Sequence, residues 1–261
     1  MEIAFKNIKS MPQEKAQNAF KNNVIEIKNL QKSFGNKKVL DDINLTLSSG
    51  ENLVILGKSG SGKSVLIKCI IGLIEPDEGS LLVLNIKIDE LNITELNELR
   101  KKIGFLFQSA ALYDSMTVRE NLEFPFRNNN ALSQTDINAL VTEALEDVGL
   151  LDAIDKMPSE LSGGMRKRIG LARSLILKPE IMLYDEPTTG LDPTTSKGIS
   201  NLIMNIQKKH HTASIIITHD IACAKIVSDR ILILHDGKCA AEGTFDSLIN
   251  SKELWIKSYF E

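Results

Sequence analysis

Residues 53–72 read LVILGKSGSGKSVLIKCIIG, and this stretch decides the fold of the chain. Four apolar residues run directly into a glycine-rich turn, and an apolar segment with helical spacing follows the turn. The turn fits the pattern G-x-x-x-x-G-K-[ST], with Gly57, Gly62, Lys63 and Ser64 at its fixed positions. The order strand, loop, helix around this pattern predicts a P-loop that binds nucleotide phosphates.

The loop has the chemistry that a polyphosphate with a divalent cation requires. Its glycines lack a Cβ, so the backbone can turn several N–H groups inward, beside the positive end of the following helix. Lys63 is expected to reach the β- and γ-phosphates, and the Ser64 hydroxyl is expected to hold Mg²⁺. The alternative is a glycine-rich surface turn before an ordinary helix. The nucleotide contacts expected from this loop are Gly57, Ser59, Gly60, Ser61, Gly62, Lys63, Ser64 and Val65.

Length and composition narrow the class of protein. The 261 residues are 43% hydrophobic, which suffices for one large core or two joined cores. The formal net charge is −3 and neither half is a basic block, so the electrostatic footprint of a DNA- or RNA-binding protein is missing from the sequence. Three scattered cysteines match no metal or disulfide spacing and predict small core residues in a reducing compartment. Without an apolar run of ~18–20 residues or a secretory signal, a soluble cytoplasmic protein is expected.

Two carboxylates follow a strongly apolar strand in IMLYDEP, residues 181–187. Acidic side chains at such a position are costly unless they have partners or a function. In a P-loop protein, Asp185 would hold Mg²⁺ through water, and Glu186 would deprotonate the attacking water. The alternative is that the two acids only cap a helix or form a turn. The presence of the P-loop and of Pro187 favours the catalytic interpretation.

Polar or aromatic side chains mark three further strand ends. IGFLF (103–107) is predicted to be a buried strand ending at Gln108, where a parallel sheet places ligand contacts. SIIIT (214–218) is predicted to end at His219, which can hydrogen-bond a γ-phosphate. Taken singly, each of these polar residues is more often a loop or structural residue. Phe34, at a predicted turn, is either a stacking platform for an adenine ring or a plain core or turn aromatic.

A second helix start suited to an anion lies in LSGGMRKRIGLARSLIL, residues 161–177. Ser162 is the predicted N-cap, and Gly163 and Gly164 leave amides open to a close ligand. Alone, such a start is usually just a capped helix, but beside a P-loop it indicates a second phosphate contact.

Together these motifs resemble those of the ATP-binding cassette (ABC) ATPases, in the family's order and over about residues 24–245. GKSGSGKS corresponds to Walker A, IMLYDE to Walker B and LSGGM to the signature motif. Gln108 corresponds to the Q-loop, Asp192 to the D-loop aspartate and His219 to the switch histidine. Phe34 stands where many members have tyrosine, which still allows stacking.

The resemblance implies an α/β fold, with a P-loop NTPase core, an antiparallel β subdomain and an inserted helical subdomain. It divides the chain into a polar N-terminal extension (1–23), an ATPase domain (24–245) whose helical subdomain covers about 109–175, and an amphipathic C-terminal tail (246–261). We assign no chemistry to the extension. The tail is expected to pack on its own domain, with a partner contact as the alternative.

The resemblance also implies a head-to-tail homodimer. ATP on Walker A of one subunit would be covered by Ser162, Gly163 and Gly164 of the other. The catalytic residues implied are Lys63, Gln108, Glu186 and His219, with Ser64, Gln108 and Asp185 around Mg²⁺ and Phe34 and Asp192 at the nucleotide.

A finer resemblance lies in FLFQSAALYDSMTVRENLEFP (105–125), in LSGGMRKRIGLARSL at the signature and in YDEPTTGLDP at Walker B. These stretches are similar to the lipid-transport branch of the maintenance-of-lipid-asymmetry (Mla) type, also known as organic-solvent-tolerance ATPases. That branch implies an integral membrane permease and an MCE-domain lipid-binding protein as partners, and a peripheral position on the cytoplasmic face of the inner or cell membrane. Leu112, Tyr113, Met116 and Phe124 would receive the permease's coupling helix, or would instead fill the helical subdomain's core.

Other functions share parts of this pattern. ATPases for amino acids, ions or lipoproteins carry the same catalytic motifs, because the ATPase does not touch the cargo. Repair and chromosome members place a long coiled coil between P-loop and signature, whereas Ser64 and Ser162 are 98 residues apart without sustained heptads. Translation members carry two cassettes, and binding-only regulatory cassettes usually lack the catalytic Glu or His. The sequence therefore predicts an ATP-hydrolysing transporter subunit, with phospholipid as the expected cargo.

Overall fold

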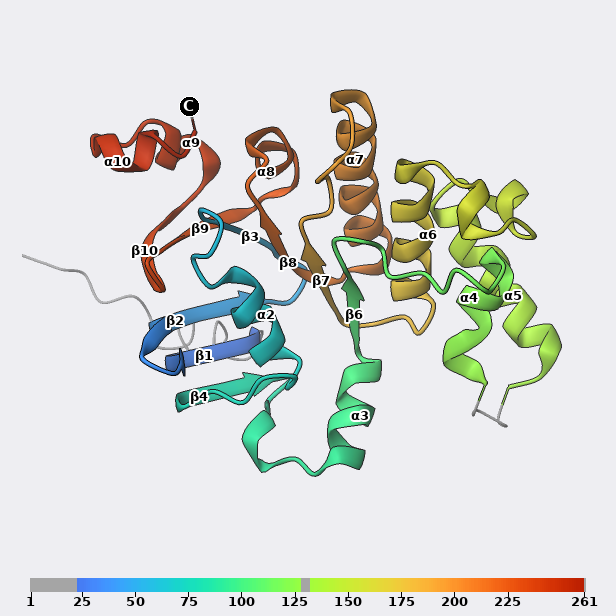
Figure 1. The fold of residues 1–261 in the computed structure, drawn as a ribbon, viewed down its shortest axis with the longest axis horizontal. Coiled ribbons are helices and arrows are strands. Elements are labelled where there is room, and N and C mark those ends of the chain that lie inside the picture. Colours follow the sequence, from blue (N-terminus) through green and yellow to red (C-terminus); the bar gives the residue numbers. More distant parts are fainter. Residues whose placement is uncertain (1–22, 128–131, 261) are drawn as a thin grey trace, which may run out of the picture.

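The computed structural model describes residues 23–127 and 132–260 (Figure 1), so the expectations for residues 1–22 lie outside the described part. Its strands form a six-stranded sheet of order β10-β9-β3-β8-β7-β6 and a four-stranded sheet of order β2-β1-β4-β5. The strands are β1 (Asn23–Phe34), β2 (Lys37–Ser48), β3 (Asn52–Leu56), β4 (Glu78–Val83), β5 (Ile86–Lys87), β6 (Ile103–Leu106), β7 (Ile181–Asp185), β8 (Ala213–Thr218), β9 (Arg230–His235) and β10 (Lys238–Gly243).

Helices cover the two faces of the six-stranded sheet, as expected for an α/β protein (Figure 1). The α-helices are α2 (Lys63–Ile70), α3 (Ile93–Lys101), α4 (Val118–Glu123), α5 (Gln134–Asp147), α6 (Gly163–Leu175), α7 (Pro193–His210), α8 (Ile221–Val227), α9 (Phe245–Ile249) and α10 (Leu254–Lys257). Short 3₁₀ turns lie at Ile88–Glu90, Phe124–Phe126, Leu151–Ala153 and Pro158–Glu160. None of the helices in the described ranges is long and apolar enough to cross a bilayer.

The central strands of the large sheet are parallel, with β3 between β8 and β9. Their side chains alternate between two hydrophobic cores, because successive residues of a strand point to opposite faces. In β3, Leu53 and Ile55 belong to the core shared with α2 and the small sheet. Helix α2 lies between the large sheet and the small sheet (Figure 1). Val54 and Leu56 belong to the core shared with α5 to α8. Near-continuous apolar runs such as LVIL are thus explained by burial on both faces.

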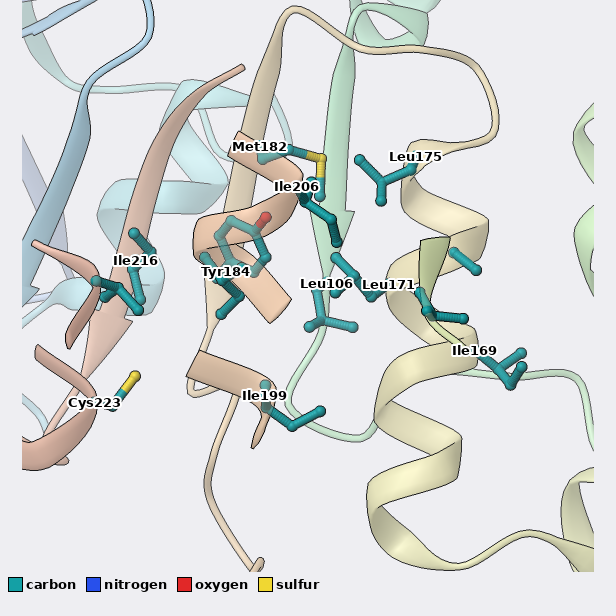
Figure 2. Close-up of a cluster of buried hydrophobic side chains, with 14 of the residues drawn as sticks. Leu106, Ile169, Leu171, Leu175, Met182, Tyr184, Ile199, Ile206, Ile216 and Cys223 are labelled. Atoms are coloured by element: carbon teal, nitrogen blue, oxygen red, sulfur yellow. The ribbon is translucent and has the colours of Figure 1, made fainter. Parts of the chain in front are cut away.

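The second core holds α6 and α7 against the sheet. Figure 2 shows Leu171 and Leu175 of α6 beside Leu106 and Met182 of β6 and β7, with Tyr184 among them. All five side chains are at most 5% exposed. This packing fixes the position of α6 relative to the C-terminal end of β7, where the two acidic residues lie.

Most of the elements predicted from the sequence are present. A capping box joins Ser133 and Asp136 at the start of α5, whose buried residues include Val141 and Leu145. Helices α4, α5 and α6 gather on the side of the molecule away from the small sheet (Figure 1). The boundaries of the helical subdomain at about 109–175 stay a prediction.

The prediction for IGFLF was wrong at its end. Strand β6 ends at Leu106, and Phe107 is 40% exposed. The chain leaves the sheet there because the Phe107 carbonyl accepts a hydrogen bond from the Ala110 N–H at 2.9 Å, which closes a turn.

Candidate functional site

A hollow of about 620 Å³ opens at the C-terminal ends of the parallel strands. It gathers residues from the P-loop, from the segments after β6 and β8, from the end of β7 and from β2 of the small sheet. Its lining residues are Lys37, Val39, Lys58, Ser59, Gly60, Gly62, Lys63, Ser64, Val65, Gln108, Asp185, Glu186 and His219. The structure therefore brings together most of the residues that the sequence assigned to a nucleotide site.

Two positions of the P-loop require glycine. Gly62, the N-cap of α2, has a φ of +104°, and a Cβ there would lie 2.7 Å from the carbonyl oxygen of Val39. At Gly57 a Cβ would lie 2.6 Å from the Leu234 carbonyl oxygen and 2.6 Å from Ser61 Oγ. The loop thus curls tightly because both positions lack a side chain.

Lys63 is held on the inner side of the loop rather than in solvent. Its side chain is 7% exposed, and Nζ donates to the carbonyl oxygens of Gly57 at 2.6 Å and Lys58 at 3.0 Å. Burial lowers the pKa of Lys63, while the charges of Glu186 and Asp185 oppose that shift. The ammonium is therefore positioned before any ligand arrives. Within the described residues, the buried Ser61 Oγ has no hydrogen-bond partner, and Gly57 and Ser61, both expected at the nucleotide, do not line the hollow.

Asp185 and Glu186, at the C-terminal end of β7, also line the hollow. Burial and, second, the neighbouring charge of Glu186 raise the pKa of Asp185. Lys68, Lys63 and Lys167 act in the other direction. A cation bound at Asp185 would favour its ionised form, so the site suits a metal.

The Glu186 carboxylate is paired with His219 in the hollow. His219 Nδ1 lies 2.8 Å from Glu186 Oε2, and the Thr189 hydroxyl donates to the same oxygen at 3.1 Å. The histidine side chain is 66% exposed, whereas Glu186 is 13% exposed. A carboxylate held in this way can accept a proton from a water molecule within the hollow.

A magnesium site fits the residues present. Ser64, Gln108 and Asp185 all line the hollow and offer hydroxyl, amide and carboxylate oxygens, the ligands that Mg²⁺ prefers. In the described residues no group of three His, Cys, Asp or Glu side chains could hold a metal alone. Phosphate oxygens and water would therefore complete the coordination, as is usual for Mg²⁺.

Several residues expected at the nucleotide lie elsewhere in the single chain. Ser162 is the N-cap of α6, as predicted, and both it and Gly163 are exposed. A Cβ at Gly164 would lie 2.5 Å from Thr195 Cγ2, so this glycine allows α6 to approach the start of α7. These three signature residues do not line the hollow, and a contact with nucleotide would need a second subunit.

Asp192 and Phe34 also lie outside the lining of the hollow. Asp192 is the N-cap of α7, and its carboxylate accepts from the Thr194 and Thr195 N–H groups and the Thr195 hydroxyl. Phe34 is half-exposed at the end of β1 and pairs with Lys37, which does line the hollow. Its position beside the hollow leaves adenine stacking open.

Sequence reasoning missed some residues of the site. Lys37 and Val39 reach it because β2 passes beside Gly62, a tertiary contact without a local signal. Lys58 lies inside the quoted P-loop pattern and could have been assigned from it. Lys167 and Thr189 hold Glu186, and only the folded chain shows this.

Comparisons with known proteins agree with this geometry. The family profile described as "ABC transporter" matches residues 40–189. The probable ribonucleotide transport ATP-binding protein of Mycobacterium leprae is 41% identical over 235 residues, which are 90% of this chain and 68% of that protein. The intermembrane phospholipid transport system ATP-binding protein MlaF of Haemophilus influenzae is 38% identical over 92% of this chain and 90% of that protein.

A solved structure with the same fold is a dimeric, post-hydrolysis state of an ATP-binding cassette bound to ADP and Pi. It superposes with a TM-score of 0.77 at 34% identity and covers 85% of this chain and 98% of that chain. The predicted fold, with its P-loop core and added subdomains, is thereby confirmed.

Replacing Gly62 with alanine should weaken ATP binding by at least about tenfold, because a Cβ there clashes with Val39 and moves the loop. Titration with a fluorescent ATP analogue measures the affinity. Gly50→Ala is the matched control, since Gly50 also has a positive φ (+72°) but a Cβ there meets no atom within 4 Å. Wild-type affinity in Gly62→Ala would contradict the role of this glycine.

Proposed function

This chain belongs to the ABC transporter family of ATPases, and we propose that two copies of it power phospholipid transport through a separate membrane permease. The observation that carries the catalytic part is the pairing of Glu186 with His219 at 2.8 Å, in the hollow that Lys63 also lines. The phospholipid part rests on the similarity to MlaF along nearly the whole of both chains.

In the proposed mechanism, Lys63 neutralises the β- and γ-phosphates and Glu186 takes a proton from the attacking water. His219 holds the Glu186 carboxylate and contacts the γ-phosphate. Mg²⁺, held by Ser64, Asp185 and Gln108, would supply charge neutralisation and polarise the phosphate oxygens.

A second copy of the chain would complete the site. Ser162 and Gly163 are exposed at the N-terminus of α6, so they are free to meet a nucleotide on another subunit. A helix N-terminus carries a partial positive charge and open N–H groups, and it therefore suits the γ-phosphate. We propose that the signature motif of each subunit covers the ATP of the other.

The permease would dock in a second hollow of about 480 Å³ beside β6. Tyr113 and Phe124 line it, with ring centroids 4.6 Å apart, and both rings are more than one third exposed. Leu112 instead packs against the core, and Met116 lies outside the lining. We therefore propose that Tyr113 and Phe124 receive a short apolar helix of the permease on the cytoplasmic face of the membrane.

Glu186→Gln should bind ATP normally but lower its turnover by about 10²–10⁴-fold, because the amide cannot take the proton. Phosphate release under saturating ATP measures the rate, and nucleotide titration measures binding. Glu180→Gln serves as the control, since Glu180 is an exposed carboxylate paired with Lys102. A wild-type rate in Glu186→Gln would refute the assignment of Glu186.

Tyr113→Glu should abolish stimulation of the ATPase by the permease while leaving the basal rate of the isolated subunit unchanged. The charge would be buried against an apolar helix, which is unfavourable by several kcal/mol. The control is Leu151→Glu, which alters a similarly exposed apolar residue (39%) outside this hollow. Assembly and transport that survive Tyr113→Glu would show that the permease docks elsewhere.

The cargo is tested by isolating the native complex and extracting its bound lipid. We expect a permease, an MCE-domain protein and phospholipid to copurify, and phospholipid to stimulate ATP hydrolysis. The mycobacterial relative's name supports ribonucleotide as the competing cargo. Stimulation by ribonucleotides in place of phospholipid would decide for that alternative.

A further inference from the structure

Two lysines are buried among the described residues, and only one belongs to the P-loop. Lys63 is 7% exposed and Lys167 is 5% exposed. Lys167 lies in the second turn of α6, five residues after the signature serine Ser162. A buried ammonium is unfavourable unless it has an anion or hydrogen-bond acceptors. The mechanism above does not use Lys167.

The acceptor of Lys167 is the main chain of the proposed catalytic residue. Lys167 Nζ donates to the backbone carbonyl oxygen of Glu186 at 3.1 Å. The same carbonyl accepts from the Thr189 N–H at 3.3 Å, and the Glu186 N–H donates to the Ile217 carbonyl at 2.9 Å. Both backbone polar groups of Glu186 are therefore fixed by other segments of the chain.

Glu186 needs this support because its backbone conformation is unfavourable. Its φ is +52°, in the left-handed region that side chains other than glycine rarely adopt. Such a conformation persists only where the surroundings enforce it, and it often occurs at functional sites. In this conformation the Glu186 carboxylate lies 2.8 Å from His219 Nδ1. A relaxed backbone would aim the carboxylate elsewhere.

We infer that Lys167 is a positioning residue, which holds the Glu186 main chain in its left-handed conformation and thereby aims the carboxylate at the γ-phosphate. The inference rests on the proposed function, since it assumes that Glu186 activates the water. Because Ser162 and Lys167 lie on one helix, the segment that would cap the partner's ATP also orients the acid in its own subunit. Movement of α6 would thus affect both nucleotide sites of a dimer.

The decisive variants are Lys167→Met, which keeps an unbranched side chain one atom shorter than lysine but removes the donor and the charge, and Lys167→Arg, which keeps both. We expect the methionine variant to lower kcat on the order of tenfold with unchanged ATP affinity, since a hydrogen bond from a charged donor is lost. The arginine variant should recover most of the rate. Lys208→Met, at an exposed position near the end of α7, is the control and should behave as wild type.

A second measurement separates positioning from loss of structure. In the Glu186→Gln background, Lys167→Met should change the residual rate by less than about twofold, because residues that act as a unit are not additive. Lys167→Gln, which removes the charge but keeps a polar side chain as long as that of methionine, replaces the methionine variant if that variant does not fold.

Three results would overturn the inference. They are a wild-type kcat without the lysine, an equal loss of ATP affinity and kcat, and a further tenfold loss in the Glu186→Gln background. A wild-type rate for Glu186→Gln alone would instead refute the proposed role of Glu186, so the two failures can be told apart.

Discussion

The site depends on the burial of opposite charges at the ends of the central strands. Lys63 comes from the P-loop and Lys167 from α6, and burial lowers the pKa of each lysine while the charges of Asp185 and Glu186 oppose that shift. A single buried charge is unfavourable by several kcal/mol, whereas two of each sign stabilise one another when hydrogen bonds complete the arrangement. The polar end of an otherwise apolar sheet can therefore stay buried and still be ready to bind an anion with its metal.

This balance requires strand ends and helix starts to be held at fixed places. The alternating side chains of β3 and its neighbours anchor the sheet in two cores, one around α2 and one beneath α6 and α7. Helix α2 then carries the P-loop and α6 carries Lys167. Because both helices are packed against the sheet, a displacement of either one would shift the residues at the ends of the strands. An ATPase that drives a membrane protein needs such a rigid connection.

The two hollows differ in chemistry, and we assign ATP hydrolysis to the one that contains Lys63 and docking of the permease to the one that contains Tyr113. The hollow with Lys63 contains charges and glycines and has the chemistry of phosphate transfer, while the one with Tyr113 is aromatic and suits an apolar partner. Gln108 lies between them in the sequence, two residues after the end of β6 and five before Tyr113. One short segment thus connects the proposed metal site with the proposed permease contact.

The sequence alone determined the P-loop, the acid pair, the second capped helix and the α/β fold. Each of these follows from short contiguous stretches whose residue types and spacing set the local structure. Only the tertiary structure decided which side chains meet. Lys37 and Val39 come to the hollow through the small sheet, Phe107 leaves the strand through a turn, and Lys167 finds the carbonyl of Glu186. The left-handed backbone of Glu186 likewise has no signal in its own residue type. These features arise from packing between segments that are distant in sequence, so the spacing of residues along the chain does not predict them.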